Sequence, residues 1–226
     1  GTAGPQPPSN SNNNHAAIFT YNNVWYHAYH NRYVANQTGV PPGYKRNLAI
    51  ERHNYAADGT MQEVVYTTDG VPQIANLNPY GRVEAETFNA QSGIETEVAS
   101  GGGMNLTSIS DGDWVHLRGV DFGAAGARTF SARVASAAGG GAIEVRLTSA
   151  TGMVVGTLPV PNTGGAQTWM SATTAVTGAT GVKDLYLRFT GSGFNVDSWE
   201  FAPVDTGGTG GSGGGGGAAG SGGSGG

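Results

Sequence analysis

Apolar residues alternate with polar or small residues along much of the chain between residues 82 and 203, and this pattern constrains the fold most. In one stretch, Ile143 and Val145 alternate with Glu144 and Arg146. Successive side chains of a β-strand point to opposite faces, so a period of two predicts strands with one face in a core and one in solvent. Further stretches with this period contain Phe130, Ala132 and Val134, and Leu185, Leu187 and Phe189.

Glycine-rich turns such as "ASAAGGGA" and "NTGG" separate these stretches. We expect roughly nine or ten strands and no helix, because short strands punctuated by such turns are typical of antiparallel sandwiches. The prediction for residues 79–204 is therefore an all-β sandwich with the jelly-roll arrangement.

The preceding part of the chain, residues 1–78, predicts two β-hairpins. The first turns at Asn22-Asn23 and the second at Asp58-Gly59, where residues 64–66, Val-Val-Tyr, form the return strand. Together they predict a four-stranded meander of the size of one propeller blade. One such sheet has no closed core and should not be stable alone.

The end of the chain, residues 205–226, is almost entirely glycine and serine. Such a segment buries no apolar surface and is predicted to be a flexible linker leading to further modules. A plain disordered tail is the alternative. The first residue is not Met, so the natural N-terminus need not be Gly1.

Composition excludes several function classes. The formal net charge is −5, whereas nucleic-acid and anionic-membrane binding require a basic surface, so neither is an expected partner. No apolar run approaches the roughly 18 residues of a membrane span. The absence of cysteine excludes disulfides, thiolate metal sites and thiol catalysis.

The stretch from residue 12 to residue 32 combines histidine, asparagine and aromatic residues as many active sites do. His27 and His30 are three apart on a predicted strand, so their side chains leave opposite faces, and no spacing that includes His15 or His53 matches a zinc site. We predict structural or substrate-facing roles. The acidic residues before residue 80 form no acid–base pair of the glycosidase kind: Glu51, Asp58, Glu63 and Asp69.

Two segments, "NNNHAAIFTYNNVWYHAYHNR" and "GYKRNLAIERHNYAADGTM", resemble the closing part of the five-bladed β-propeller of family 43 glycoside hydrolases, over about residues 11–78. The resemblance implies a parent enzyme that hydrolyses O-glycosyl bonds with inversion. It also implies that the base, the acid and the pKa modulator come from earlier blades and are absent from this chain. His15 matches a histidine near the propeller axis, and Arg46 matches a basic residue near a substrate subsite.

A second set of motifs resembles family 6 carbohydrate-binding modules over nearly all of residues 80–203. These motifs are "GRVEAETF", "GGMNLTSISDGDWVHLRGVDFG", "FSARVAS", "EVRLTSATGMVVGTLPV", "TGGAQTW", "DLYLRFTG" and "FNVDSWEF". With "NPYGRVEAE" at the junction, the combination is similar to arabinoxylan arabinofuranohydrolases. This implies a secreted protein of plant cell-wall degradation whose partner is xylan or arabinoxylan.

Three carboxylates suggest a metal site. Glu84 and Glu86 are two apart on a predicted strand, so they would share a face and repel unless a cation or a basic group lies between them. If the first and last strands of the sandwich are neighbours, Asp197 lies near, and an oxygen-rich set of this kind suits Ca²⁺. The resemblance implies a structural calcium here; the alternative is two exposed glutamates at a strand edge.

The resemblance also implies a sugar site at the loop end of the sandwich, where two aromatic rings clamp xylose and an asparagine adds a polar contact. The asparagine matches Asn195, but the two aromatic positions fall at Ser108 and Ala166. Trp169 is the remaining candidate ring, with a core position as its alternative, whereas Trp114 and Trp199 are predicted to be core residues. We therefore expect weak binding at this site, binding on the concave sheet face, or a purely structural module that supports the propeller.

Overall fold

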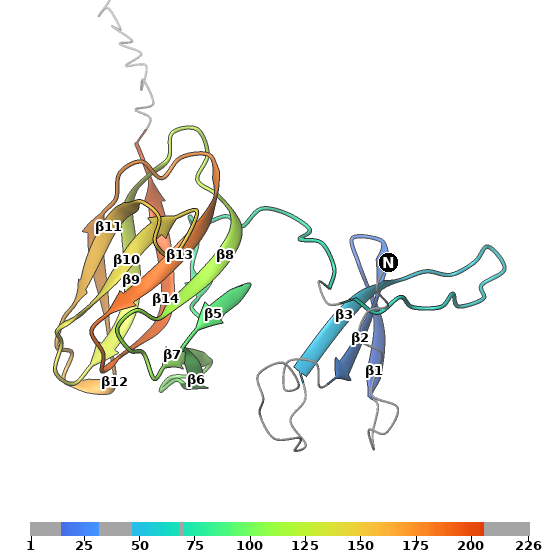
Figure 1. Cartoon of the computed structure of the whole chain (residues 1–226), viewed down its shortest axis with the longest axis horizontal. Coiled ribbons are helices and arrows are strands. Elements are labelled where there is room, and N and C mark those ends of the chain that lie inside the picture. Colours follow the sequence, from blue (N-terminus) through green and yellow to red (C-terminus); the bar gives the residue numbers. More distant parts are fainter. Residues whose placement is uncertain (1–14, 32–46, 68–69, 206–226) are drawn as a thin grey trace, which may run out of the picture. The chain divides into compact units, whose positions relative to one another are not determined.

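The computed structural model describes residues 15–31, 47–67 and 70–205 (Figure 1). The chain divides into two compact units, Gly1–Ile74 and Ala75–Gly226. All the regular elements of the described residues are β-strands, and every strand pair is antiparallel, as predicted. No helix that could span a bilayer occurs in the part of the chain that the structure describes. Arg46 and the glycine-rich tail lie outside these residues.

The first unit contains a three-stranded sheet in the order β1-β2-β3, made of β1 (Ala16–Tyr21), β2 (Val24–Asn31) and β3 (Asn47–His53). The β1–β2 turn has positive φ at both central residues, 48° at Asn22 and 58° at Asn23. Asparagine tolerates this conformation, and two-residue hairpin turns of the type I′ class require it. The predicted first hairpin is confirmed.

The predicted fourth strand of this unit is wrong. The Asp58-Gly59 turn forms, with φ of +84° at Gly59, but residues 64–66 enter no ladder. The backbone N–H and the hydroxyl of Thr67 instead donate to Glu51 Oε1, at 2.7 and 3.0 Å. Glu51 is 4% exposed, so it is a buried acceptor that fixes this segment.

The second unit is a β-sandwich of two sheets. One has the order β11-β10-β13-β8-β5, and the other has the order β12-β9-β14-β7-β6 with β4 paired to β14. The strands are β4 (Val83–Glu84), β5 (Ala90–Ser92), β6 (Glu95–Val98), β7 (Met104–Thr107), β8 (Trp114–Asp121), β9 (Ala127–Ser136), β10 (Gly141–Leu147), β11 (Val154–Val160), β12 (Gly165–Ala175), β13 (Val182–Thr190) and β14 (Phe194–Pro203).

The core of the sandwich contains the apolar residues that alternate in the sequence. Ile143, Val145, Leu185 and Phe189 are fully buried, and Trp199 is 2% exposed, as predicted for it. Since these side chains point inward, their polar neighbours in sequence point outward. The sandwich therefore presents two separate outer faces, one for each sheet.

Candidate functional site

The outer face of the five-stranded sheet carries a row of aromatic side chains. Tyr186 of β13 is the register partner of His116 of β8, and their rings are stacked with centroids 4.4 Å apart. The ring of Trp114, two residues before His116, has its centroid 5.5 Å from that of Tyr186, and the two ring planes are inclined by 58°. Trp114 and Tyr186 are half-buried, so part of each ring is accessible. The prediction that Trp114 is a core residue is wrong, because its neighbour Val115 takes the inward position.

Charged residues continue this row on β13 and on the next strand, β10. Arg188 is the register partner of Trp114 on one side and of Glu144 on the other. Glu144 Oε2 accepts hydrogen bonds from Arg188 Nη1 at 2.9 Å and from Arg146 Nε at 3.0 Å. Flat aromatic surface beside fixed polar groups is what a site needs to bind the apolar face and the hydroxyls of a sugar.

The Glu144 carboxylate should make this face sensitive to acid. Burial by itself would raise the pKa of Glu144, but hydrogen bonds from Arg146 and Arg188 outweigh it and hold the pKa below its ordinary value of 4.5. A lowered pKa stabilises the folded state above the unfolded-state pKa, and this stabilisation is lost as the pH falls through the folded-state value. We expect wild type to have a higher melting temperature than Glu144→Gln at pH 7, with the difference shrinking below pH ~4.5. A difference that stays constant from pH 7 to pH 3 in thermal melts would contradict this.

The loop end of the sandwich has a different character. Asn195 is 6% exposed, and its Nδ2 donates to Glu97 Oε1 at 2.8 Å and to the carbonyl of Ala166 at 2.9 Å. Ser108 donates to Glu95 Oε2 at 3.2 Å. The structure thus brings Asn195 and Ala166 together, but neither Ala166 nor Ser108 offers a ring on which a sugar could stack.

Trp169 lies on the outer side of the second sheet. Its indole Nε1 donates to Ser100 Oγ at 3.0 Å, and the Arg133 guanidinium lies 5.1 Å from the ring centroid, over its face. The ring is half-buried, which excludes the alternative of a core tryptophan. Because Arg133 covers one ring face, a sugar could stack only on the other.

The predicted carboxylate cluster differs from expectation in two ways. Strand β4 ends at Glu84, and a turn closed by Thr87 N–H donating to the Glu84 carbonyl contains Glu86. The two glutamates therefore do not share a strand face, which corrects the prediction. The charge of Glu84 is balanced by Arg82, whose Nε and Nη2 donate to the two carboxylate oxygens at 2.9 Å each.

Asp197 lies beside β4, as predicted, and is likewise bound by arginine. Its Oδ2 accepts hydrogen bonds from Arg82 Nη2 and Arg133 Nη1, both at 2.9 Å. Glu86 Oε2 is buried and has no hydrogen-bond partner among the described residues. Across residues 15–31, 47–67 and 70–205, no three His, Cys, Asp or Glu side chains form a group that could hold a metal ion.

Comparison with known proteins identifies the second unit. Residues 84–203 match the carbohydrate binding module family 6. The chain belongs to this family. The family 6 module is similar to a module from Clostridium cellulolyticum solved in complex with xylose, with 45% identity, a TM-score of 0.54, and coverage of 56% of this chain and 99% of that one.

The similarity to other proteins extends beyond the family 6 module. Arabinoxylan arabinofuranohydrolases from Paenibacillus polymyxa and Bacillus subtilis are 48% and 52% identical over 87% and 82% of the chain, which spans 32% and 38% of their length. The crystal structure of the family 43 arabinoxylan arabinofuranohydrolase from Bacillus subtilis, in complex with cellotetraose, matches 86% of this chain and 42% of that one, with 50% identity and a TM-score of 0.78. The predicted resemblance is confirmed.

In the first unit, the histidines occupy the two faces that we predicted. The His27 ring lies 6.4 Å from His53 and 6.2 Å from Tyr66, whereas the His30 ring lies 6.2 Å from His15. Burial lowers the pKa of His27 below its ordinary value, and the nearby His53 lowers it further. His15 is exposed, and its substrate-pocket role stays a prediction.

Sequence reasoning missed Tyr186, His116, Arg188 and Glu144 of the family 6 module as candidate ligand residues. The sequence does place each of them at a polar-face position of an alternating strand. It does not reveal the order of the strands in the sheet, and only the pairing of β8 with β13 and of β13 with β10 brings these residues together.

Proposed function

We propose that the family 6 module binds a xylan-type polysaccharide across the outer face of β8, β13 and β10. The observation that carries this proposal is the pair of half-buried rings, Trp114 and Tyr186, flanked by the Arg188–Glu144 pair. The rings would lie against the apolar faces of successive sugars, and the charged groups would bind hydroxyls. A related module was solved with xylose, and the similar hydrolases are named for arabinoxylan.

The loop end supports a weaker contact. Asn195 already uses both amide hydrogens within the protein, so a sugar would have to bind Oδ1 or replace one of these bonds. Without a ring at position 108 or 166, such a contact lacks the stacking contribution of about 1 kcal/mol per ring. Sugar binding by Asn195 and Trp169 therefore remains a secondary proposal.

Isothermal titration of the full chain with xylohexaose, soluble arabinoxylan and cellohexaose tests the proposed function. We expect saturable binding of the xylan ligands. An absence of heat with every ligand, together with unchanged mobility in affinity gels containing these polysaccharides, would contradict the proposal and favour a module that only supports its neighbour.

We further propose that the first unit is the closing part of a five-bladed propeller in a secreted, inverting arabinoxylan hydrolase. Supporting this, the β1–β2 hairpin exposes Phe19, Tyr21 and Trp25, an unusual amount of large apolar surface for so small a sheet. The imidazole nitrogens of His53, a residue only 1% exposed, have no hydrogen-bond partner among the described residues, as expected where further structure completes a site. Hydrolysis is assigned to the parent enzyme, with its catalytic carboxylates outside this chain.

We also propose a structural calcium ion at the start of the sandwich. The buried, unpartnered Oε2 of Glu86 fits a calcium ligand, because a buried carboxylate oxygen needs a positive partner. Glu84 and Asp197 remain predicted calcium ligands, although in this structure both carboxylates accept hydrogen bonds from arginine side chains. The ion would fix the turn after β4 against β14.

Removal of calcium should therefore destabilise the module. A ligand that binds only the folded state raises its stability, so chelation should lower the melting temperature by about 5 °C. Glu86→Gln should have a lower melting temperature that no longer responds to chelator, whereas Glu200→Gln should respond as wild type does. A wild-type melting temperature that is the same with calcium and with chelator would refute the site.

A further inference from the structure

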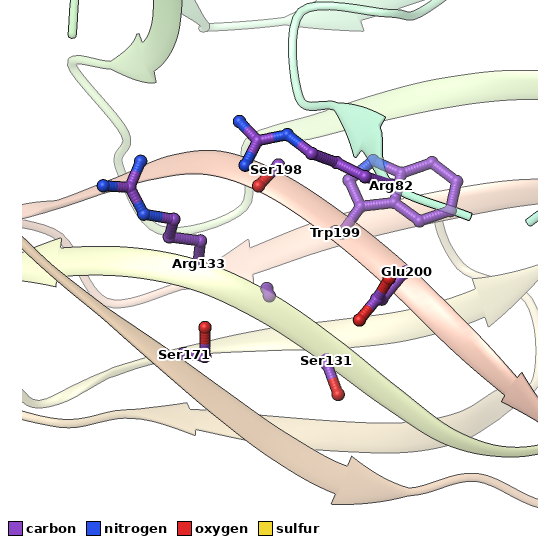
Figure 2. A pocket seen from close by; sticks show the side chains of 8 residues that line it. Arg82, Ser131, Arg133, Ser171, Ser198, Trp199 and Glu200 are labelled. Carbon is purple, nitrogen blue, oxygen red and sulfur yellow. The ribbon is translucent and has the colours of Figure 1, made fainter. Parts of the chain in front are cut away.

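A pocket of about 130 Å³ lies on the outer face of the second sheet (Figure 2). Trp114, on β8, belongs to the other sheet of the sandwich. Strands β9, β12 and β14 and the segment before β4 form it. Its polar lining consists of Arg82, Arg133, Ser131, Ser171, Ser198 and Glu200. No part of the xylan-binding proposal uses these residues.

One end of the pocket carries two arginine side chains that are held in place. Arg82 and Arg133 both donate to Oδ2 of Asp197, whose side chain is 2% exposed, while the arginine side chains are 52% and 35% exposed. A shared buried acceptor fixes the two guanidinium groups, and Trp169 supports Arg133 from one side. The pKa of Arg82 is raised, first by its hydrogen bond with Glu84, so this charge is permanent. Guanidinium groups fixed in this way lose little entropy when they bind a carboxylate.

The other end of the pocket offers oxygen atoms. Glu200 of β14 is the register partner of Ser131 of β9, and Ser171 of β12 is the register partner of Arg133. Figure 2 shows Ser198 between the two arginines and Ser131 with Glu200 at the far end. Hydroxyls and a carboxylate can bind the hydroxyls of a sugar ring.

The overall charge of the site indicates what kind of anion fits. Glu84, Asp197 and Glu200 together outweigh the two arginines by one negative charge. A small free anion would gain little from such surroundings. A ligand that places a carboxylate at the arginine end and hydroxyls at the Glu200 end matches both halves.

We propose that this pocket binds a uronic acid, with the sugar carboxylate at Arg133 and Arg82 and ring hydroxyls at Ser171, Ser131 and Glu200. This inference rests on the proposed function, and it extends the ligand from neutral xylan to xylan that carries acidic sugar substituents. The two outer faces would then bind the polysaccharide backbone and its acidic side groups separately.

Amide chemical-shift titration of the full chain with methyl glucuronoside tests the pocket, with methyl glucoside and sodium acetate as comparison ligands. We expect methyl glucuronoside to bind at least about tenfold more tightly than either comparison ligand and to shift amides of β9, β12 and β14. Arg133→Gln should weaken this binding about tenfold or more. Ser171→Phe should do the same, since it fills the pocket from an exposed strand position without removing a buried partner. Arg128→Gln, on the same strand but paired with Asp205, should bind as wild type does.

Three results would overturn the inference: equal binding of methyl glucoside, equal shifts with acetate (a site for an ion only), or unchanged binding by Ser171→Phe. The test is independent of the backbone-binding face. If the wild-type chain binds methyl glucuronoside but not xylohexaose, only the proposed function is refuted. If it binds xylohexaose but not methyl glucuronoside, only this pocket is refuted.

Discussion

Replacing Trp114 with alanine should weaken the binding of xylohexaose by about 10- to 100-fold. The ring is half-buried, its centroid lies 5.5 Å from that of Tyr186, and its accessible part supplies flat apolar surface to the proposed face. Truncation removes this surface and leaves the sandwich core intact, since the inward neighbour Val115 is unchanged. Isothermal titration measures the affinity, and circular dichroism verifies the fold.

Trp169 provides the matched control. It is also a half-buried tryptophan, but it lies on the other sheet and is held by Ser100 and Arg133. We expect Trp169→Ala to change xylohexaose affinity by less than about threefold. If Trp169→Ala abolished binding while Trp114→Ala did not, the loop-end contact with Asn195 would be the main site and our proposal would be wrong.

The double substitution Arg82→Gln with Arg133→Gln should destabilise the module by about 3–5 kcal/mol. Asp197 is 1% exposed, and both arginines donate to the same carboxylate oxygen. Removing both leaves a buried negative charge, and among the described residues only the Ser198 hydroxyl, at 3.2 Å, still donates to that oxygen. Urea denaturation at fixed calcium concentration measures the free energy of unfolding.

The surface pair Arg128–Asp205 provides the comparison for this prediction. Its side chains are 53% and 74% exposed, so Arg128→Gln should cost less than about 1 kcal/mol despite the short 2.6 Å contact. Asp197→Asn should cost less than the double arginine variant, because the partly exposed arginines can be hydrated. Equal losses for the double variant and for Arg128→Gln would show that the buried carboxylate does not depend on these arginines.

The strands of the sandwich could be predicted because local pattern and final burial agree. Ile143, Val145 and Leu185 alternate in the sequence and are 0% exposed in the structure. The prediction of a fourth strand in the first unit was wrong because the β-propensity of residues 64–66 was overridden by hydrogen bonds from Thr67 to the Glu51 side chain. No local pattern signals that competition.

The sites were less predictable, since they depend on strand order and on single backbone turns. Trp114 and Tyr186 are about seventy positions apart in the sequence, and the alternation does not say which strands are neighbours. The calcium prediction assumed a continuous strand through Glu86, but β4 ends at Glu84. Arg82 precedes that glutamate by two positions and could have been considered as the basic group that the carboxylates require.

The most direct test of the account is to map the amide chemical shifts that xylohexaose perturbs in the full chain. We predict the largest perturbations at Trp114, His116, Tyr186 and Arg188, on β8 and β13, with small changes at Asn195 and Ala166. Perturbations centred on Asn195, Ala166 and Ser108, with none at Trp114 or Tyr186, would contradict the assignment of xylan binding to the outer face of the five-stranded sheet.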